Sequence, residues 1–386
     1  MSTVLILGGG VGGVVAAGTL RKLLPKEHRI IVVDREQNHL FAPSLLWLMI
    51  GDRKSQKIAR PLARLNRKGI EFVQGETESI DPEKKSVRVS GRELARELAA
   101  DALIVSLGAD LVPQAIPGLK EAGQNIYTLD GAESISRSLS SFAGGKIVVL
   151  TAAPAYKCPA APYEAAMLID YHLKRLGVRA KTRIDLYAAE PAPMGTAGPE
   201  VSAGVRQMVE SKSIQYFPNH QVTEVDAVSR RIKFANGVNA DFDLLFYVPP
   251  HRAPEVVKNA GLLSESGWVS VDRHTLETKF KGVYAIGDVT AIPLKMGKPL
   301  PKAGVFAHGQ AEVVARNIAA EWTARGEKHR FDGVGQCFIE TGGHRAGIGK
   351  GNFYAEPTPQ VAIKQPAIRW HLAKILFEKQ WLWKWF

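Results

Sequence analysis

Cysteine is scarce in this chain. The 386 residues include two cysteines, Cys158 and Cys337, which are too few for the disulfide framework of small secreted proteins. A chain of this length folds into two or three domains with a substantial core and needs no such framework. The two cysteines therefore indicate either redox chemistry or a pair of ordinary buried thiols.

Long apolar runs are also missing. The nearest candidate, residues 40–50, falls well short of the about 18 to 20 apolar residues that a membrane-spanning helix needs. The chain begins with Met1, Ser2 and Thr3 and enters an apolar strand directly, without the charged segment and cleavage site of a signal peptide. We expect no signal peptide, and a peripheral position if the protein meets the cell membrane.

Acidic residues are in deficit. Lys and Arg number 50 against 38 Asp and Glu, a formal net charge of +12, which favours an anionic surface or substrate, or is simply a solvated basic surface. No basic stripe is interleaved with aromatic residues in a recognisable nucleic-acid module, so no nucleic-acid partner is expected, and no metal site is expected either. The hydrophobic share of 45% and the charged share of 23% are typical of a folded protein.

Glycine, in contrast, is concentrated near the N-terminus between two apolar segments. Residues 3–7 and 29–34 have the pattern of buried parallel strands, and the residues before Leu24 have that of a helix. The glycines of the turn are Gly8, Gly10, Gly12 and Gly13. Three of them have the spacing G-x-G-x-x-G, which in this strand, turn and helix context predicts a dinucleotide-binding turn; the alternative is a plain tight turn.

Each position of this motif has a physical role. The first glycine permits the turn, the second lets the backbone approach a pyrophosphate, and the third lets helix and strand pack closely. The helix N-terminus favours the anion. Asp34, 21 residues beyond Gly13, is expected to accept hydrogen bonds from ribose hydroxyls, and Arg35 beside it is also assigned to the cofactor site.

A second motif distinguishes between cofactors. Residues 282–288 (GVYAIGD) form a short apolar segment that ends in Gly287 and Asp288. A buried strand ending there places the Asp288 carboxylate against a ribityl hydroxyl, with the next helix N-terminus aimed at the pyrophosphate. The two motifs together favour FAD over NAD, although a strand followed by Gly-Asp is also an ordinary turn.

Together the two motifs resemble the FAD fold shared by glutathione reductase, type II NADH dehydrogenase and sulfide:quinone oxidoreductase, and the resemblance spans most of the chain. It implies an α/β fold with two Rossmann-like domains and a C-terminal amphipathic, membrane-associating region. The expected ranges are 1–110 with 275–325 for the FAD-binding domain, 111–274 for the second domain, and 326–386 for the region of quinone and membrane contact. Residues 103–108 match the crossover strand of this fold, and Gly108 and Pro43 are assigned to the cofactor site.

The second domain departs from the family pattern. Residues 146–150, 162–176 and 183–188 repeat the strand, helix and strand of the first domain. Between that strand and helix, however, the sequence is TAAPAYKCP at 151–159, without the glycines of a dinucleotide turn. Side chains and prolines there obstruct a pyrophosphate, so a standard NADH site is not expected.

Cys158 lies in this altered turn, just before the second helix. A helix N-terminus and a neighbouring cation such as Lys157 stabilise a thiolate, so we expect a perturbed, reactive thiol. Glu164 in the first helical turn is a candidate proton acceptor, or simply a favourable acid at that position. Cys337 lies in a predicted strand followed by a glycine turn, GQCFIETGG.

Three segments resemble one branch of this fold. The sequences KCPAAPYEAA around Cys158, CFIETGG at Cys337 and FEKQWLWKW near the C-terminus are similar to sulfide:quinone oxidoreductases and to the flavin subunit of flavocytochrome c sulfide dehydrogenase. In those relatives the two matching cysteines form a redox disulfide beside the flavin. The resemblance therefore implies that Cys158 and Cys337 form such a pair.

Two departures refine this expectation. Many sulfide:quinone oxidoreductases have a third cysteine where this chain has Tyr127, so growth of long polysulfide chains is in doubt. The cysteine that attaches FAD covalently in some relatives is absent from residues 41–44, so non-covalent FAD is expected. The expected lack of a signal peptide argues against the periplasmic, cytochrome-linked relative and favours a quinone acceptor.

Tryptophan is concentrated at the C-terminus, where four of the seven lie in residues 367–386. Apolar residues recur there at near-helical spacing (Ile368, Leu372, Ile375, Leu376, Phe386), and cations accompany them (Arg369, Lys374, Lys379, Lys384). This composition predicts an amphipathic helix on a membrane surface. The alternative is a terminal helix packed on the body or on a second subunit of a homo-oligomer.

A quinone that enters from the membrane needs aromatic neighbours. Phe338, Phe353 and Tyr354 are expected, by resemblance, to flank its ring. Lys302 resembles a lysine that related enzymes place near the flavin or quinone, where a cation stabilises anionic reduced flavin. A solvated loop lysine is the alternative.

The sequence thus predicts sulfide:quinone oxidoreductase activity: hydrosulfide attacks a Cys158–Cys337 disulfide, FAD takes two electrons, and a membrane quinone receives them. The first rival is a type II NADH:quinone oxidoreductase, which needs a second dinucleotide site and no cysteine pair. The second rival is a non-enzymatic, redox-sensing flavoprotein with the same fold.

Overall fold

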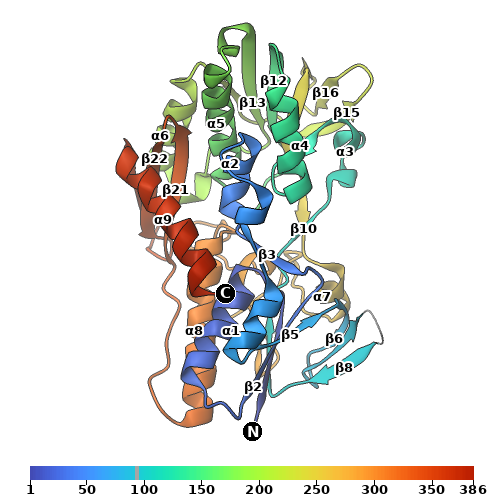
Figure 1. Cartoon of the computed structure of the whole chain (residues 1–386), viewed down its shortest axis with the longest axis vertical. Helices are drawn as coiled ribbons and strands as arrows, with labels where there is room; N and C mark the ends of the chain where they lie inside the picture. The colour runs from blue at the N-terminus through green and yellow to red at the C-terminus, as the bar shows by residue number, and fades with distance from the viewer. Residues whose placement is uncertain (92–94) are drawn as a thin grey trace.

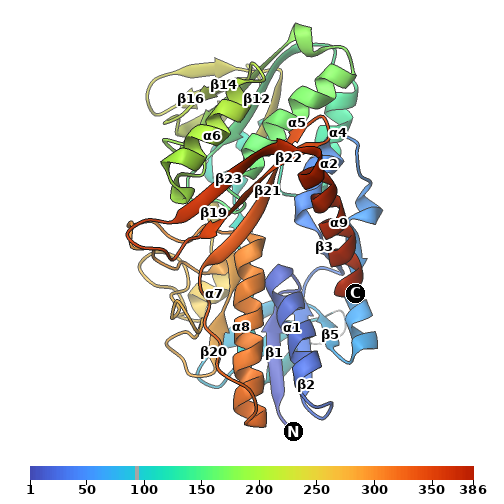
Figure 2. The same ribbon diagram turned by 90° about the vertical axis from the view of Figure 1, so that its left-hand side faces the viewer.

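The computed structural model describes residues 1–91 and 95–386. Two lobes, each built on a five-stranded parallel sheet, follow one another along the long axis of the molecule (Figure 1). A three-stranded antiparallel sheet and the last helix lie along the side of both lobes (Figure 2). This arrangement confirms the expected α/β fold with two Rossmann-like domains.

The first sheet has the strand order β20-β9-β1-β2-β5, and all neighbours are parallel. Its strands are β20 (Val283–Ala285), β9 (Ala102–Val105), β1 (Thr3–Leu7), β2 (Arg29–Asp34) and β5 (Glu71–Gln74). In the central strand β1, Leu5 is paired with Ile31 on one side and Leu103 on the other. Such continuous apolar strands form where both faces of a parallel sheet are covered.

Both faces of this sheet are indeed covered. On one face Val4 and Ile6 share a core with α1 (Val11–Leu23) and α8 (Gly304–Thr323), which pack against each other. On the other face Leu5 and Leu7 share a core with a small antiparallel sheet and α7. These elements are β6 (Glu76–Asp81), β7 (Ser86–Ser90), β8 (Arg96–Ala99) and α7 (Glu255–Asn259). The alternation along β1 is the period of two that a strand imposes.

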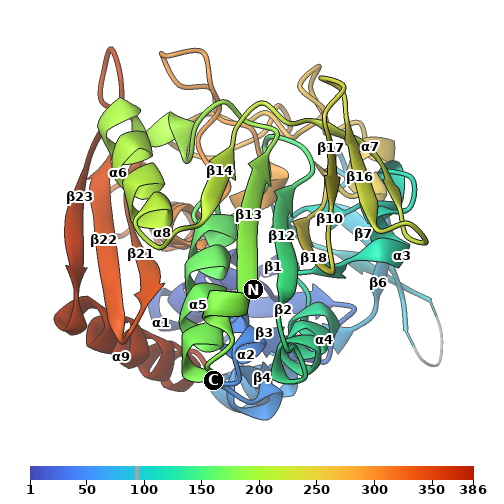
Figure 3. The ribbon, with the colours of Figure 1, turned by 90° about the horizontal axis from the view of Figure 1, so that it is seen from above.

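The second sheet repeats this plan with the order β11-β18-β12-β13-β14. Its strands are β11 (Gln124–Asn125), β18 (Leu244–Val248), β12 (Gly145–Thr151), β13 (Thr182–Ala188) and β14 (Gln215–Phe217). One face is covered by α4 (Leu129–Ser140), α5 (Ala161–Arg175) and α6 (Pro199–Glu210), and the other by β15 (Val222–Asp226), β16 (Arg231–Phe234) and β17 (Asn239–Asp241). Figure 3 shows α5 lying along this sheet.

The third sheet joins the two lobes. Its strands β21 (Val334–Gly342), β22 (Arg345–Asn352) and β23 (Gln360–Ala367) follow one another in an antiparallel meander and lead into α9 (Ile368–Lys384). β21 packs against α5 of the second lobe and α8 of the first. Cys337 is therefore carried by a strand that touches both lobes.

Several short elements complete the structure. They are β3 (Asn38–Leu40), α2 (Leu45–Met49), β4 (Ala59–Pro61), β10 (Asp110–Leu111), α3 (Leu119–Ala122) and β19 (His251–Arg252). β10 and β19 pair where the chain crosses between lobes. After β19, Val257, Leu262 and Val269 pack in the core of the first sheet. The domain ranges remain predictions, and we propose that the chain returns to the first lobe near residue 253 rather than 275.

The inward side of helix α9 carries two charged residues beside its buried tryptophans. Lys374 and Glu378 are buried, whereas Leu372, Leu376 and Trp383 are 57%, 66% and 79% exposed. The expectation that Lys374 is a surface cation for lipid headgroups is wrong, because this side chain lies inside the protein. Within the part of the chain that the structure describes, no helix is both long and apolar enough to cross a membrane. Membrane association of α9 stays a prediction.

Candidate active site

The turn between β1 and α1 contains glycines that no other residue replaces without strain. Gly8 has φ +100°, and a Cβ atom there would lie 2.3 Å from the Ser106 carbonyl oxygen. A Cβ atom on Gly13 would lie 1.8 Å from the Gly8 carbonyl oxygen, and one on Gly12 would lie 2.5 Å from Ser106 Oγ. These close approaches are the turn and the helix–strand packing that the motif requires.

Gly10 differs from the other glycines. It is exposed at the N-terminus of α1, and a Cβ atom there would meet no atom of the described residues within 4 Å. Nearby, Asp34 Oδ2 accepts a hydrogen bond from Gly9 N–H at 2.5 Å, and burial raises the pKa of Asp34. The backbone at Gly10 is therefore open to a large anionic group, as a pyrophosphate site requires.

Three further residues assigned to the cofactor site lie on separate segments of the first part of the chain. Arg35 is a surface residue 3.6 Å from Glu76. Pro43 lies exposed in the 3-10 helix Ala42–Ser44, which precedes α2. Gly108, after β9, has φ +69° and open space at its Cβ position. Their assignment to FAD stays a prediction.

The second motif ends in a buried carboxylate oxygen. After β20 the chain turns at Gly287, whose φ is +75° and whose N–H donates to Gln310 Oε1 of α8 at 2.7 Å. Asp288 Oδ1 is buried and has no hydrogen-bond partner among the described residues, and burial raises the pKa of Asp288. Because buried polar atoms are nearly always paired, this oxygen fits a ribityl hydroxyl. Together with the open backbone at Gly10, it makes the first lobe a good fit for FAD.

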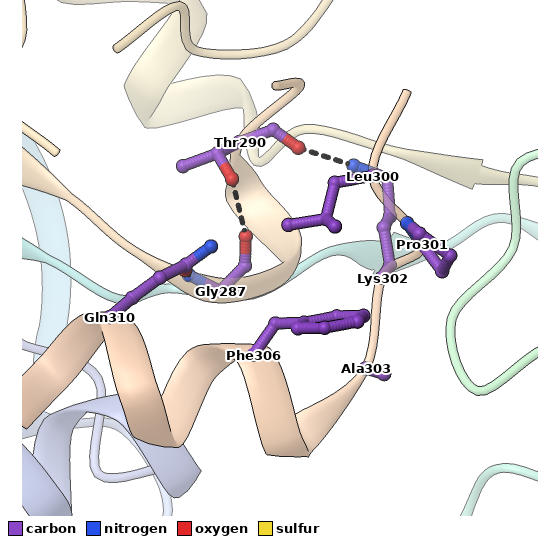
Figure 4. A pocket seen from close by; sticks show the side chains of 8 residues that line it. All are labelled: Gly287, Thr290, Leu300, Pro301, Lys302, Ala303, Phe306 and Gln310. Carbon is purple, nitrogen blue, oxygen red and sulfur yellow. Dashed lines mark hydrogen bonds between the residues drawn. The ribbon is translucent and has the colours of Figure 1, made fainter. Parts of the chain in front are cut away.

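Lys302 is held inside the protein. Its Nζ donates to the carbonyl oxygens of Asp288 and Thr290, both at 2.8 Å, and lies 3.4 Å from the centre of the Trp268 ring. Figure 4 shows the bond to Thr290 on the wall of a small cavity that Phe306 of α8 also lines. Burial lowers the pKa of Lys302 to about 8. Lys302 is therefore not a solvated loop lysine.

The turn that holds Cys158 is fixed from both sides. Cys158 N–H donates to Lys302 O at 2.6 Å. The Tyr127 hydroxyl donates to Lys157 O at 2.5 Å and lies 3.2 Å from Cys158 O. Cys158 has φ +48°, a left-handed conformation that residues other than glycine adopt rarely and mainly where the surroundings enforce it. Cys158 is thus presented in a defined position next to the segment of Lys302.

Cys337 approaches Cys158 from β21. This strand packs on α5, which begins three residues after Cys158, and Glu340 N–H of β21 donates to Glu164 Oε1 of α5 at 2.6 Å. Both cysteines are partly buried free thiols. Burial, followed by the neighbouring Cys337, raises the pKa of the Cys158 thiol well above its usual value. The segments that carry the two cysteines therefore lie side by side, and both thiols have Glu164 and Lys374 as neighbouring charges.

The thiol pKa values contradict one expectation. Burial raises the pKa of Cys337 to about 12, so both cysteines are held as neutral thiols, and the expected thiolate stabilised by Lys157 is wrong. Lys157 Nζ lies instead 5.6 Å from the centre of the Tyr127 ring. The cation that lowers the pKa of both thiols, against the larger effect of burial, is Lys374 of α9.

Lys374 belongs to a buried ionic cluster beside the cysteines. Its Nζ donates to Glu164 Oε1 at 3.1 Å, and both side chains are 4% exposed. The Glu340 carboxylate is also buried and lies 3.0 Å from His371 Nδ1. Burial by itself would lower the pKa of Lys374, but Glu164 and Glu340 raise it overall. The lysine is therefore a buried cation between two carboxylates.

Sequence patterns did not single out Glu340 and His371 or the inward position of Lys374. One signal was present, since Glu340 interrupts the apolar run of a predicted strand. His371 and Lys374 are also three residues apart, which puts them on one face of a helix. That this face meets α5 and β21 is a tertiary contact, which periodicity alone does not reveal.

Protein side chains fill the turn between β12 and α5, where a second dinucleotide would bind. Glu190, just beyond β13, accepts hydrogen bonds from Thr151 Oγ1 at 2.7 Å, from the Tyr163 hydroxyl at 2.8 Å and from the Tyr156 hydroxyl. An acidic residue near the end of this strand is the one that holds the ribose in an NAD-binding domain. Here protein hydroxyls occupy it, which argues against an NADH site.

The three residues expected at a quinone ring do not lie together. Phe353 is buried against Phe306 of α8, with the ring centres 5.1 Å apart, and Tyr354 follows it. Both lie at the Val334 end of β21, since Val334 pairs with the residue just before Phe353. Phe338 is four residues further along that strand, next to Cys337.

Phe338 joins a different group, which we call the α9 aromatic cluster: Phe41, Phe338, Phe377 and Trp381. The Phe377 ring centre is 6.5 Å from that of Phe338, 5.6 Å from that of Phe41 and 5.9 Å from that of Trp381. Phe377 is 39% exposed. The cluster therefore runs from the strand of Cys337 to the exposed side of α9.

Comparison with known proteins places this fold and site in a class. The family model for pyridine nucleotide-disulphide oxidoreductases matches residues 2–311, which include both five-stranded sheets. The chain belongs to this family and is an oxidoreductase with the fold of its flavoprotein members.

Within the family, the sequence is similar to the sulfide-quinone reductase of Aquifex aeolicus (strain VF5), with 30% identity over 99% of this chain and 90% of that protein. It is 24% identical to the mitochondrial sulfide:quinone oxidoreductase of Mus musculus over 92% of this chain and 79% of that one. The X-ray structure of the sulfide:quinone oxidoreductase from Aquifex aeolicus matches with a TM-score of 0.89 and 27% identity, covering 100% of this chain and 91% of that chain. These matches confirm the resemblance to sulfide:quinone oxidoreductases that was inferred from the sequence.

Proposed function

We propose that the protein is a sulfide:quinone oxidoreductase that oxidises sulfide at Cys158 and Cys337 and passes the electrons through FAD to a membrane quinone. The observation that carries the proposal is that the segments of Cys158 and Cys337 pack together and that both thiols have the buried Glu164–Lys374 pair as neighbours, next to a lobe that fits FAD. Relatives named for this activity, which match nearly the whole chain, support it.

In the proposed reaction the cysteines alternate between a disulfide and a reduced form. Hydrosulfide attacks one sulfur of the disulfide, so that a new sulfur–sulfur bond forms and the Cys158–Cys337 bond breaks. One cysteine becomes a persulfide and the other a thiolate. The outer sulfur of the persulfide is then transferred to a nucleophilic sulfur acceptor, which leaves both cysteines reduced. Re-formation of the Cys158–Cys337 bond releases two electrons, which FAD, held at the Gly8–Gly13 turn and Asp288, would accept and pass to the quinone.

Proton transfer is a requirement of this site, because burial raises the pKa of both thiols. A neutral thiol is a weak nucleophile, and the Glu164 carboxylate is an acidic group that interacts with both sulfurs. We therefore assign Glu164 the role of proton acceptor. Lys374, hydrogen-bonded to Glu164, supplies the positive charge that stabilises a developing thiolate.

Lys302 acts on the cofactor side of the proposal. The carbonyl oxygens of Asp288 and Thr290 hold its ammonium group in a fixed position. Its pKa of about 8 leaves it mostly protonated at neutral pH although it is desolvated. A desolvated cation stabilises negative charge on a bound group next to it more strongly than a solvated one.

In this proposal the quinone, which is the electron acceptor, binds at the α9 aromatic cluster. The exposed apolar side of α9, formed by Leu372, Leu376 and Trp383, lies in this proposal on the membrane surface. A quinone then enters from the lipid along Phe377 toward Phe338, the neighbour of Cys337. Phe353 and Tyr354 stay predictions without support from this geometry.

Single replacement of each cysteine by serine tests the proposed function. We expect both Cys158→Ser and Cys337→Ser to bind FAD but to lose bleaching of the flavin absorbance by sulfide, measured by anaerobic stopped-flow. The control is reduction by dithionite, which must remain unchanged in both variants. Full sulfide-driven bleaching in either variant would refute the role of the pair.

The same assay separates the rivals. Bleaching by NADH and not by sulfide would identify a type II NADH:quinone oxidoreductase, against which the protein hydroxyls on Glu190 argue. A protein that binds FAD but shows no multiple turnover with sulfide and a soluble quinone would instead be a non-enzymatic flavoprotein.

A further inference from the structure

The C-terminal helix is connected to the dinucleotide turn by hydrogen bonds. Trp381 Nε1 of α9 donates to His39 Nε2 at 3.0 Å, and the other ring nitrogen of His39, Nδ1, lies 2.9 Å from Gly9 O. Gly9 N–H donates in turn to Asp34 Oδ2 at 2.5 Å. The peptide groups on both sides of Gly9 are thus fixed, one by Asp34 and the other by a residue that α9 holds.

The chemistry of the donors determines the direction of each bond. An indole N–H is only a donor, so His39 Nε2 must accept the bond from Trp381. A neutral imidazole then carries its proton on Nδ1 and donates it to Gly9 O. His39 is buried, and burial lowers its pKa to about 4, so the neutral form is present at neutral pH. Trp381 therefore selects the tautomer of His39 that binds the turn.

The Gly9 carbonyl determines where the next N–H points. In a trans peptide the carbonyl oxygen and the following amide hydrogen lie in the same plane and point in opposite directions across the C–N bond. With Gly9 O held toward His39, the Gly10 N–H is directed away from His39. Gly10 is the exposed glycine at the N-terminus of α1, where backbone N–H groups bind anions.

Other contacts keep Trp381 in place on the first lobe. Glu378, one turn earlier in α9, accepts hydrogen bonds from Ser44 Oγ at 2.6 Å and Arg53 Nε at 3.0 Å. One turn later, the Trp385 ring lies against Gly18 of α1, where a Cβ atom would be 2.7 Å from the ring. The side of α9 that carries Trp381 is therefore a specific docking surface on the FAD-binding lobe.

We propose that Trp381 and His39 are positioning residues for the pyrophosphate of FAD. They act through the Gly9–Gly10 peptide plane and do not touch the cofactor, and Trp381 does so from a position 342 residues away from His39 in the sequence. The proposal depends on FAD binding and is independent of the sulfide chemistry, so the failure of one does not imply the failure of the other.

The replacement Trp381→Phe tests this proposal, because it retains an aromatic ring and removes the donor. We expect the dissociation constant of FAD to rise roughly 3- to 10-fold, the effect of one lost hydrogen bond, in a fluorescence titration of the full-length protein stripped of FAD. The matched control is Trp383→Phe, two residues further along α9 on its exposed side, with an unchanged dissociation constant. Equal FAD affinity of the two variants would overturn the proposal, and so would a loss of thermal stability of Trp381→Phe without a change in affinity.

A second measurement uses the wild-type protein and does not depend on whether the Trp381 variant folds. In the FAD-loaded wild-type protein with ¹⁵N-labelled histidine, we expect the NMR signals of His39 at neutral pH to show a protonated Nδ1 and an unprotonated Nε2. The signals are assigned with His39→Gln. A proton on Nε2 would overturn the proposal, because Trp381 would then have no acceptor and Gly9 no donor.

Discussion

Lys374 of α9 and Glu164 of α5 form an ion pair that is almost completely buried, with Nζ 3.1 Å from Oε1. The same carboxylate oxygen accepts the Glu340 N–H of β21. One carboxylate therefore joins the C-terminal helix, the strand of Cys337 and the helix that follows Cys158. A buried pair of this kind is costly to break, because the remaining charge has no partner.

The first prediction concerns this pair. Replacing Lys374 by Met leaves the Glu164 charge buried without its cation, and we expect the free energy of unfolding to fall by about 3–5 kcal/mol in chemical denaturation. Lys379, on the exposed side of the same helix, provides the matched control, and Lys379→Met is expected to change stability by less than about 0.5 kcal/mol.

A double replacement separates the pair from simple packing. Glu164→Gln together with Lys374→Met removes both charges at once, so it should destabilise the protein less than the sum of the two single changes. Strictly additive effects would show that the two side chains do not depend on each other.

Much of the fold was predictable from the sequence because it depends on local patterns. β1 and β2 have the predicted bounds, and β12, α5 and β13 differ from prediction by one residue at their ends. Apolar strands covered on both faces and glycines that tolerate no Cβ atom leave an unambiguous pattern. The cofactor-binding lobe follows from these signals.

The ionic and aromatic parts of the site were not predictable in the same way. Lys374 has the spacing of a surface cation on an amphipathic helix, and the packing of α9 against β21 and β22, with Glu164 of α5 beside it, buries it. The thiol pKa of Cys158 depends on how much protein surrounds the sulfur, and burial outweighs the helix N-terminus. Phe353 is adjacent to Tyr354 in a hairpin, yet strand pairing puts both far along β21 from Phe338. The corrections to Lys374 and to the Cys158 thiol both concern contacts between segments distant in the sequence.

The second prediction is a pH dependence of stability caused by His39. Its pKa is lowered from 6.5 to about 4 in the folded protein, so the unfolded chain binds the proton first as the pH falls. The stabilisation is complete above pH about 6.5 and is lost as the pH falls toward 4, by on the order of 3 kcal/mol. We expect the His39→Gln variant to lose less of its free energy of unfolding between these pH values than the wild type does. Parallel curves for the two proteins would contradict this assignment.

The third prediction compares two glycines of the dinucleotide turn. In Gly13→Ala the new methyl group meets the Gly8 carbonyl oxygen at 1.8 Å, and we expect a loss of more than about 2 kcal/mol of stability. In Gly10→Ala the methyl group enters open space, so the protein should fold, with a loss of stability of about 1 kcal/mol from the poorer N-cap, but bind FAD more weakly. Thermal melting and FAD content measure the two effects. The reverse pattern would show that Gly10 does not face the cofactor.

The disulfide state of the cysteines is the most direct test of the proposed chemistry. The air-oxidised, FAD-loaded protein is denatured with an alkylating agent, digested without reductant and analysed by mass spectrometry, with and without prior anaerobic treatment with dithiothreitol. We predict a peptide pair linked through Cys158 and Cys337 in the oxidised protein, and alkylation of both cysteines after reduction. Two fully alkylated cysteines in the oxidised, FAD-loaded protein would contradict a redox disulfide at this site.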